Sequence, residues 1–333
     1  MIRIWYLVSG ISRLVAYSLW LVACGLWLMA YVPELQAGTF AYITNQGADN
    51  VSVLDTATGA KVATIPVGHR PAGIAVSRAD ARAYVSNPES KEVSIIDTKT
   101  RTLIKNIPVG DGPVGIAVNN AGTRVFIADW YQHAIFILDT GTMAITGNIP
   151  VGHSPSGVAV SPDDKYIYVA NRDDNNLMII DATAGTVLST IAVGKAPFGI
   201  TVSENGEQIY VANVQSSDIS IIDARSRSVI ATVTVGSFPY AIAEDSAHRR
   251  LFVTNQHDNT VSVIDQNTHK TITTITVGEY PEGIDKLPNA AQIYVADWFD
   301  DNVSVIDTNS LAVIRKIGTD SSSRAFGKFF SPY

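Results

Sequence analysis

The chain has 333 residues, of which 46% are hydrophobic and 17% charged, a composition typical of a globular protein with a large core. Its formal net charge of −7 argues against nucleic-acid binding as a main role, because that affinity comes from clustered Lys and Arg. Its single cysteine, Cys24, excludes an intrachain disulfide framework and a thiolate metal site.

Residues 1–37 have the features of an export segment. Two arginines, Arg3 and Arg13, precede an uncharged run of 19 residues, 14–32, which is just long enough to cross a bilayer as a helix. Three interpretations remain open: a cleaved secretory signal ending near Ala37, an uncleaved membrane anchor, or a lipoprotein modified at Cys24. All three carry the rest of the chain across a membrane. We therefore expect a periplasmic or otherwise extracytoplasmic protein that contacts the membrane only through this segment.

The rest of the chain, residues 38–333, repeats with a period of 42 residues. An aromatic residue within a β-branched run recurs at Tyr42, Tyr84, Phe126, Tyr168, Tyr210, Phe252 and Tyr294. Three positions after each stands an Asn or Asp. An Asp that closes a second apolar run recurs at Asp55, Asp97, Asp139, Asp181, Asp223, Asp265 and Asp307, and we interpret it as a turn former. A fixed period of this length predicts a solenoid, a propeller or an array.

One repeat contains four short strand patterns, at 157–161, 166–171, 176–181 and 186–193, separated by turn residues such as Pro-Asp-Asp-Lys. Seven such repeats predict an all-β, seven-bladed β-propeller with four antiparallel strands per blade. The first repeat begins at Phe40 with a second-strand pattern and lacks its own first strand.

We expect residues 324–330 to complete blade one from the carboxyl end, since closure removes exposed sheet edges. We also expect that residues 318–323 supply the extra chain length that this seam needs. We expect the protein to be a monomer.

The Tyr-Val-Ala-Asn, Val-Ser-Val-Ile-Asp and Val-Gly-x-x-Pro-x-Gly elements resemble the YVTN-type β-propeller repeat family of exported bacterial and archaeal proteins. The resemblance covers residues 38–333 and implies the fold and an extracytoplasmic setting. Members of the family have mixed or unknown activities, so the resemblance implies no particular function. Related propellers serve as lactonases and as carriers of haem or quinone cofactors.

Comparison among the repeats separates structural residues from candidate functional ones, because a residue needed by one site differs from its six counterparts. The loops that join the second strand to the third, and the fourth to the next first, emerge on one face. On that face, Trp130, Tyr131, Trp298 and Phe299 replace polar residues, and Arg172 is a further candidate. Exposed aromatic residues beside a channel mouth predict a surface for a ligand or a partner protein.

The middle residue of Pro-x-Gly should lie where the blades crowd the axis. We assign Phe198, Tyr240, Glu282 and Phe326 to this position in four blades, so that one side of the channel mouth is apolar with a carboxylate in it. The glycines themselves should permit close approach of neighbouring backbones.

Two histidines and an aspartate, His69, Asp111 and His153, occupy equivalent loop positions in three successive blades and are candidate ligands of a transition metal. Loops on neighbouring blades are too far apart for a shared metal unless they fold inward. Solvated loop side chains are therefore the favoured interpretation.

The sequence carries no nucleophile-elbow, zinc-protease or phosphate-loop motif. The leading hypothesis is a non-catalytic propeller that binds a partner protein or a small ligand on its loop-rich face. The alternative is an enzyme or cofactor-handling protein. In that case the working groups around the channel would be His69, His153, Arg172, Arg324 and Glu282. No cofactor is identified by the sequence.

Overall fold

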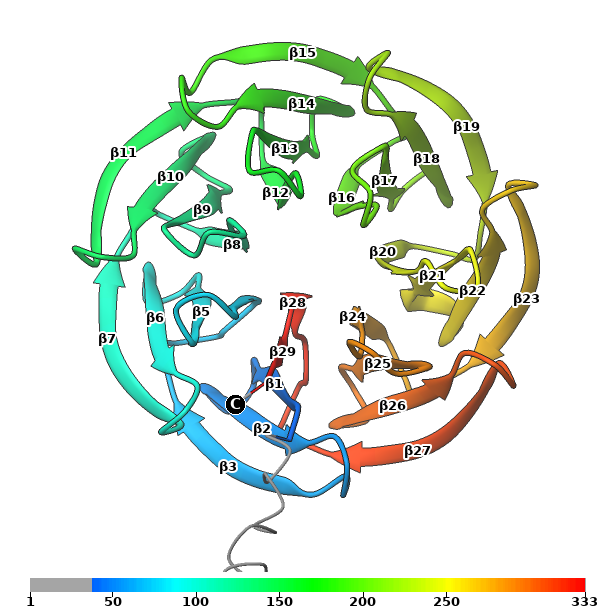
Figure 1. The fold of residues 1–333 in the computed structure, drawn as a ribbon, viewed down its shortest axis with the longest axis horizontal. Helices are drawn as coiled ribbons and strands as arrows, with labels where there is room; N and C mark the ends of the chain where they lie inside the picture. The colour runs from blue at the N-terminus through cyan, green and yellow to red at the C-terminus, as the bar shows by residue number, and fades with distance from the viewer. Residues whose placement is uncertain (1–37, 333) are drawn as a thin grey trace, which may run out of the picture. The chain divides into compact units, whose positions relative to one another are not determined.

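The computed structural model describes residues 38–332, which form seven β-sheets arranged around one axis (Figure 1). The prediction of an all-β, seven-bladed propeller is confirmed. Within this range the only helix is a single 3-10 turn, η1 (Gln256–Asp258). No helix in residues 38–332 has the length and apolar character needed to cross a membrane. The export segment and its three interpretations lie outside the described residues.

The strands follow one another around the ring, four to a blade, from the axis outward. Blade one has β1 (Phe40–Asn45), β2 (Asn50–Asp55), β3 (Lys61–Pro66) and β29 (Phe330–Ser331). Blade two has β4 (Gly73–Ser77), β5 (Arg82–Asn87), β6 (Glu92–Asp97), β7 (Thr102–Pro108) and the added β28 (Phe326–Lys328). Blade three has β8 (Pro113–Val118), β9 (Arg124–Asp129), β10 (Ala134–Asp139) and β11 (Ala144–Pro150). Blade four has β12 (Pro155–Val160), β13 (Tyr166–Asn171), β14 (Asn176–Asp181) and β15 (Val187–Ala192). Blade five has β16 (Pro197–Val202), β17 (Gln208–Asn213), β18 (Asp218–Asp223) and β19 (Ser228–Thr234). Blade six has β20 (Pro239–Asp245), β21 (Arg250–Asn255), β22 (Thr260–Asp265) and β23 (Lys270–Thr276). Blade seven has β24 (Pro281–Lys286), β25 (Gln292–Asp297), β26 (Asn302–Asp307) and β27 (Ala312–Gly318).

The turn after each third strand is fixed by its aspartate, as predicted. In blade four the Oδ1 atom of Asp181 accepts hydrogen bonds from the backbone N–H groups of Thr183 and Ala184, at 2.8 and 2.7 Å. These bonds favour the charged form and lower the pKa of Asp181. In each of the other six blades the equivalent aspartate accepts at least one such backbone N–H bond, so these carboxylates are structural.

The core lies between neighbouring blades. The repeated aromatic residues of the second strands are at most 2% exposed, and the second and third strands carry most of the buried apolar side chains. Arginines at the start of some second strands add polar links across the blade boundaries. Arg82, Arg124 and Arg250 each donate from Nη1 to a backbone carbonyl 58 residues further along, in the next blade, at 2.8 to 3.0 Å.

The ring is closed by the carboxyl-terminal segment, as predicted, because β29 pairs antiparallel with β1 and completes blade one. Ser323 pairs with Asn45 as Pro197 pairs with Asn213, so the 42-residue register continues through 318–323 without extra residues. The prediction that residues 318–323 contain extra chain length is therefore wrong. The extra residues lie in β28, which leaves blade one and pairs in parallel with β4 of blade two. As a consequence Arg324, and not Phe326, occupies the axial position between Ser323 and Ala325.

Candidate functional site

The middle residues of the five Pro-x-Gly turns, and of the equivalent Pro-Tyr-Ala and Ser-Arg-Ala turns, form a ring around the axis: Ala72, Val114, Ser156, Phe198, Tyr240, Glu282 and Arg324. Blades two to four contribute small side chains to this ring, whereas the remaining blades contribute large ones. In five of the seven turns the following residue is a glycine that lies against the backbone of the next blade, which holds the turn at the axis. A Cβ atom on Gly157 would stand 2.1 Å from the carbonyl oxygen of Phe198.

Three aromatic rings meet across the axis and close the channel. The ring centroid of Phe198 lies 4.3 Å from that of Tyr240 and 5.0 Å from that of Phe326, and all three side chains are at most 6% exposed. Phe326 reaches this aromatic plug from β28, although it is not an axial turn residue. The structure thus brings together the residues that the sequence placed on one side of the channel.

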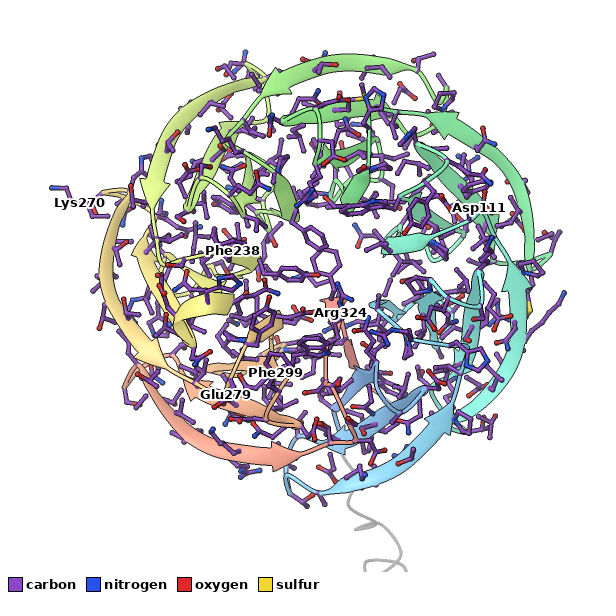
Figure 2. All side chains as sticks on the ribbon, turned by 180° about the vertical axis from the view of Figure 1, so that it is seen from behind. Asp111, Phe238, Lys270, Glu279, Phe299 and Arg324 are labelled. Atoms are coloured by element: carbon purple, nitrogen blue, oxygen red, sulfur yellow. The ribbon has the colours of Figure 1, made fainter. Side chains whose placement is uncertain are left out.

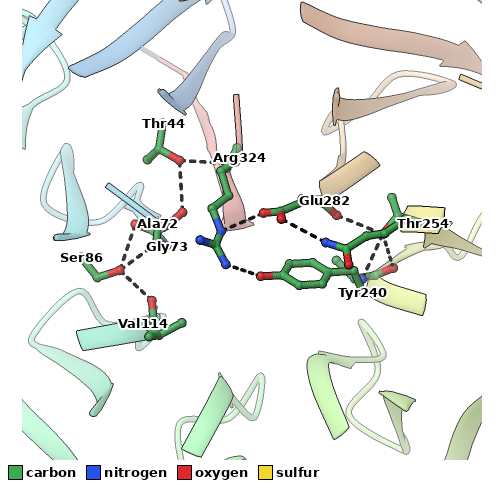
Figure 3. Close-up of polar contacts among 12 residues, drawn as sticks. Thr44, Ala72, Gly73, Ser86, Val114, Tyr240, Thr254, Glu282 and Arg324 are labelled. Carbon is green, nitrogen blue, oxygen red and sulfur yellow. Dashed lines mark hydrogen bonds and ion pairs between the residues drawn. The ribbon is translucent and has the colours of Figure 1, made fainter. Parts of the chain in front are cut away.

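Beside the plug, a buried ion pair joins Arg324 to Glu282, with 2.7 Å between Nε and Oε2 (Figure 3). The Nη2 atom of Arg324 donates to the Tyr240 hydroxyl, and Gln256 Nε2 donates to Glu282 Oε1 at 3.0 Å. Burial raises the pKa of Glu282, and the guanidinium opposes that rise. Burial also raises the pKa of Tyr240 above its usual range, so this hydroxyl stays protonated.

The guanidinium keeps one free edge. Among residues 38–332, the Nη1 atom of Arg324 has no hydrogen-bond acceptor, whereas Nε and Nη2 face Glu282 and Tyr240 (Figure 3). Arg324 lines a cavity of about 230 Å³ on the loop-rich face, here called the upper axial pocket. Its other main walls are Ala72, Val114, Trp130, Tyr131 and Phe198. The pocket is therefore an apolar and aromatic space with one cation at its side.

The outer rim of this pocket is the loop after β9. The Asp129 carboxylate accepts four backbone N–H groups of the surrounding loops, at 2.7 to 3.1 Å, and fixes the loop that carries Trp130. The ring centroid of Trp130 lies 6.4 Å from that of Phe198, and the Arg172 guanidinium lies 5.6 Å from the Trp130 ring. Tyr131 is 70% exposed and covers Gly112.

Trp298 and Phe299 belong to a separate aromatic cluster on the same face, over blades six and seven. Figure 2 shows Phe299 beside Glu279 and away from the axial Arg324. Tyr280 contacts both Trp298 and Phe299, at 5.5 and 5.2 Å between ring centroids. Phe299 is 59% exposed. The structure therefore does not bring this pair together with Trp130 and Tyr131.

The histidine and aspartate loops do not converge. His69 Nδ1 pairs with Asp49 Oδ2 at 2.9 Å, and His153 Nδ1 pairs with an aspartate of its own blade at 2.8 Å. Asp111 accepts from Lys91 and Gln132. Within residues 38–332 no group of three or more His, Cys, Asp or Glu is placed to hold a metal ion. The proposed metal set of His69, Asp111 and His153 is thus not assembled, because each member is held by partners of neighbouring loops.

The opposite mouth contains charged residues that sequence comparison had not singled out. Blades two to five have valine at, or one residue before, the end of the first strand, whereas the corresponding residues from blade six onward are Glu244 and Lys286, with Lys328 after them in the seam. Asp285 likewise replaces an alanine or threonine. The same repeat comparison that identified the loop residues would have found these, had it been extended to the first strands.

Comparison with known proteins supports the fold. A family model described as "Lactonase, 7-bladed beta-propeller" matches residues 133–229, less than a third of the chain. No curated protein matches the chain.

Several solved structures share the architecture. Hydrazine synthase from Kuenenia stuttgartiensis is 23% identical, with a TM-score of 0.72, over 80% of this chain and 92% of that one. A functionally unknown protein from Desulfotomaculum acetoxidans DSM 771 is 14% identical, with a TM-score of 0.74, over 86% and 99%. The dihydro-heme d1 dehydrogenase NirN in complex with DHE is 13% identical, with a TM-score of 0.65, over 85% and 73%. At these identities the likeness concerns the fold alone.

Proposed function

We propose that the protein is a non-catalytic, exported propeller of the YVTN type that binds a small organic anion in the upper axial pocket. The observation that carries the proposal is the free Nη1 edge of Arg324 beside an apolar, aromatic pocket. An arginine already oriented by Glu282 and Tyr240 needs little reorganisation to accept a carboxylate.

The ion pair with Glu282 orients the guanidinium without occupying all of it. Glu282 faces the Nε edge, so the Nη1 group stays available for a second, charge-assisted hydrogen bond. The Trp130 and Phe198 rings form apolar walls on which a flat ligand body can stack. These features favour a compact, flat, apolar molecule that carries one anionic group.

Benzoate is a suitable probe, with binding measured by calorimetry and by ligand-observed NMR. Because a lone Arg324→Gln change would leave Glu282 buried and unpaired, the test variant is the double Arg324→Gln/Glu282→Gln. We expect it to abolish benzoate binding, and Trp130→Ala to weaken binding about tenfold, the loss of one stacking surface. Arg225→Gln, on an exposed turn of blade five, is the matched control and should bind as the parent does. Unchanged binding by the double variant would refute the proposal.

The second candidate is a lactonase-like enzyme, which the match at residues 133–229 favours together with the buried Glu282, Arg324 and Tyr240 beside the pocket. His69 and His153, which the sequence included in this alternative, do not line the pocket. Ring opening of a lactone releases a proton near neutral pH and can be followed in a pH-stat. If the parent protein hydrolyses a lactone and Glu282→Gln abolishes that activity, the protein is an enzyme, and this function replaces the binding proposal.

The extracytoplasmic location and the monomeric state belong to the same proposal. They are supported by the export-like composition of residues 1–37 and by the sheets of residues 38–332 closing into one ring. Intact-mass analysis of protein from the native membrane and soluble fractions tests the location. A species that begins near Gly38 supports a cleaved signal, whereas retention of residues 1–32 in membranes supports an anchor. A co-purifying protein would instead direct attention to Trp298 and Phe299.

A further inference from the structure

The aromatic plug divides the axial channel into two separate spaces. Below Phe326, a cavity of about 350 Å³ is lined by the first strands of blades two to seven and shares no lining residue with the upper axial pocket. It continues into a wider vestibule of about 930 Å³ at the opposite mouth, since Val118, Val202 and Lys328 line both. We call these two spaces together the lower axial cavity.

The inner part of the lower axial cavity is apolar. Its walls are mainly aliphatic side chains of successive first strands, with Phe326 at the plug: Ile116, Val118, Val160, Ile200, Ile242 and Ile284. An apolar space that opens on one side only favours an apolar ligand body, because burial of that body removes its surface from water.

The vestibule combines apolar side chains with charged ones, and most of the charged ones come from blades five to seven and the seam. Val76, Val118 and Val202 line it from blades two, three and five, whereas Glu244 and Lys286 face it from blades six and seven. Two of the cations, Lys328 and Lys286, are already held by carboxylates, whereas Arg78 of blade two lines the vestibule without an ion pair to any described residue. Lys328 Nζ lies 2.9 Å from Asp285 Oδ1, and Lys286 Nζ lies 3.9 Å from an oxygen of the buried Asp245.

Two carboxylates of the vestibule, Glu204 and Glu244, form no ion pair among residues 38–332, although their charges help to raise the pKa of the nearby Lys328. Glu244 accepts from Gln266 Nε2 and from the backbone N–H of Glu204, both at 2.8 Å, and Glu204 accepts from Ser246 Oγ at 2.6 Å. These neutral donors hold the two carboxylates at the cavity mouth, where a ligand ammonium group can form charge-assisted hydrogen bonds with them.

We propose that the lower axial cavity binds an amphipathic ligand whose apolar body fills the space below Phe326 and whose ammonium head lies between Glu204 and Glu244. This second site goes beyond the function proposed for the upper axial pocket and does not depend on it. The two sites select opposite charges, since the upper one offers a guanidinium and the lower one carboxylates.

The test uses three probes with the same apolar body: hexylammonium, hexanol and hexanoate. Calorimetry should show hexylammonium bound at least tenfold more tightly than hexanoate, with hexanol between them. Glu244→Gln should weaken hexylammonium about five- to tenfold and leave hexanol unchanged, the usual effect of removing one charge-assisted bond. Glu207→Gln is the matched control, because this exposed glutamate lies in the same turn as Glu204 but outside the lower axial cavity.

A variant of the apolar wall separates head recognition from burial of the body. Val160→Thr keeps the side-chain shape but adds a hydroxyl, and it should weaken all three probes alike. The Arg324→Gln/Glu282→Gln variant should bind hexylammonium as the parent does, which keeps this test independent of the upper pocket. Equal affinity for hexylammonium and hexanoate, or no loss in Glu244→Gln, would overturn the proposal.

Discussion

Asp129 and Asp297 occupy the same repeat position but lie in different environments. Five blades have asparagine there, and in blade five the Nδ2 atom of Asn213 donates to Asp218 Oδ1 and Ser220 Oγ. Asp129 is surrounded by four backbone N–H donors, which suit a carboxylate. Asp297 is fully buried and accepts one side-chain hydrogen bond, from Ser304 Oγ at 2.6 Å, while its Oδ1 atom has no donor among residues 38–332. Burial raises the pKa of Asp297 to about 7.

We predict that Asp297→Asn stabilises the protein, and more so at high pH. The pKa of the folded state lies above the ordinary value of 3.8, so the native protein loses stability as the pH rises from about 4 to 7 and Asp297 ionises in a buried site. The amide cannot ionise, and its Nδ2 group would meet Asn302 Oδ1, which lacks a donor. Urea unfolding should show a gain of about 1–3 kcal/mol at pH 8 and a smaller change at pH 5.

Asp129→Asn provides the control for this effect, because it removes a charged acceptor from four N–H donors and should destabilise the protein. A pH-independent effect of Asp297→Asn would contradict the assigned ionisation. The sequence shows an Asn or Asp at this position in every repeat but does not separate Asp129 from Asp297, since the difference depends on the direction of N–H groups in the surrounding loops. In blade three the backbone at Gly110, with φ of +53°, helps to aim those groups at Asp129.

At the scale of the strands, the repeat predicts most of the fold because each strand has its own signal. The expected strands 166–171 and 176–181 coincide with β13 and β14, and 157–161 and 186–193 differ from β12 and β15 at their ends. The parallel pairing of β28 with β4 was not predictable from the repeat. Only the two extra residues in the seam produce it, and no other blade contains such a strand.

The close approach of first strands at the axis leads to a prediction for the Pro-x-Gly glycines. Gly157→Ala would place a Cβ atom 2.1 Å from the carbonyl oxygen of Phe198, so neighbouring blades would have to separate. We expect a loss of about 3 kcal/mol in the free energy of unfolding, measured by urea titration. Gly147→Ala, on the exposed strand β11 with open space around it, is the matched control and should change stability by less than about 0.5 kcal/mol. Equal effects of the two changes would show that the axial contact is not tight.

At the scale of the whole ring, closure depends on a short seam. The strand β29 contributes two residue pairs to β1, and the seam gains further bonds from Thr44, which accepts from the backbone N–H of Ala325 at 2.8 Å. The sequence predicted this closure from the missing first strand of blade one. It did not predict the division of the channel, because the aromatic plug depends on side chains from blades five and six and the seam meeting across the axis.

Asp285 of blade seven binds the seam segment at Lys328 and Phe329. We predict that its removal destabilises this segment more than the rest of the ring. Its buried carboxylate accepts from the backbone N–H of Phe329 at 3.1 Å and from Lys328 Nζ at 2.9 Å. Asp285→Ala would leave the buried Phe329 N–H without an acceptor and should cost about 2–3 kcal/mol. Lys328→Met removes only the ion pair of a mostly exposed lysine and should cost less than about 1 kcal/mol.

Amide hydrogen exchange distinguishes local opening of the seam from general destabilisation. In Asp285→Ala the amides of Tyr42 and Phe329 should exchange faster than in the parent, whereas the amide of Val169 in blade four should keep the protection set by global unfolding. Tyr42 is informative because its N–H donates to the Phe329 carbonyl at 2.9 Å across the seam. Equal acceleration at all three amides would mean that the seven blades unfold as one unit and that the seam is not a separate point of opening.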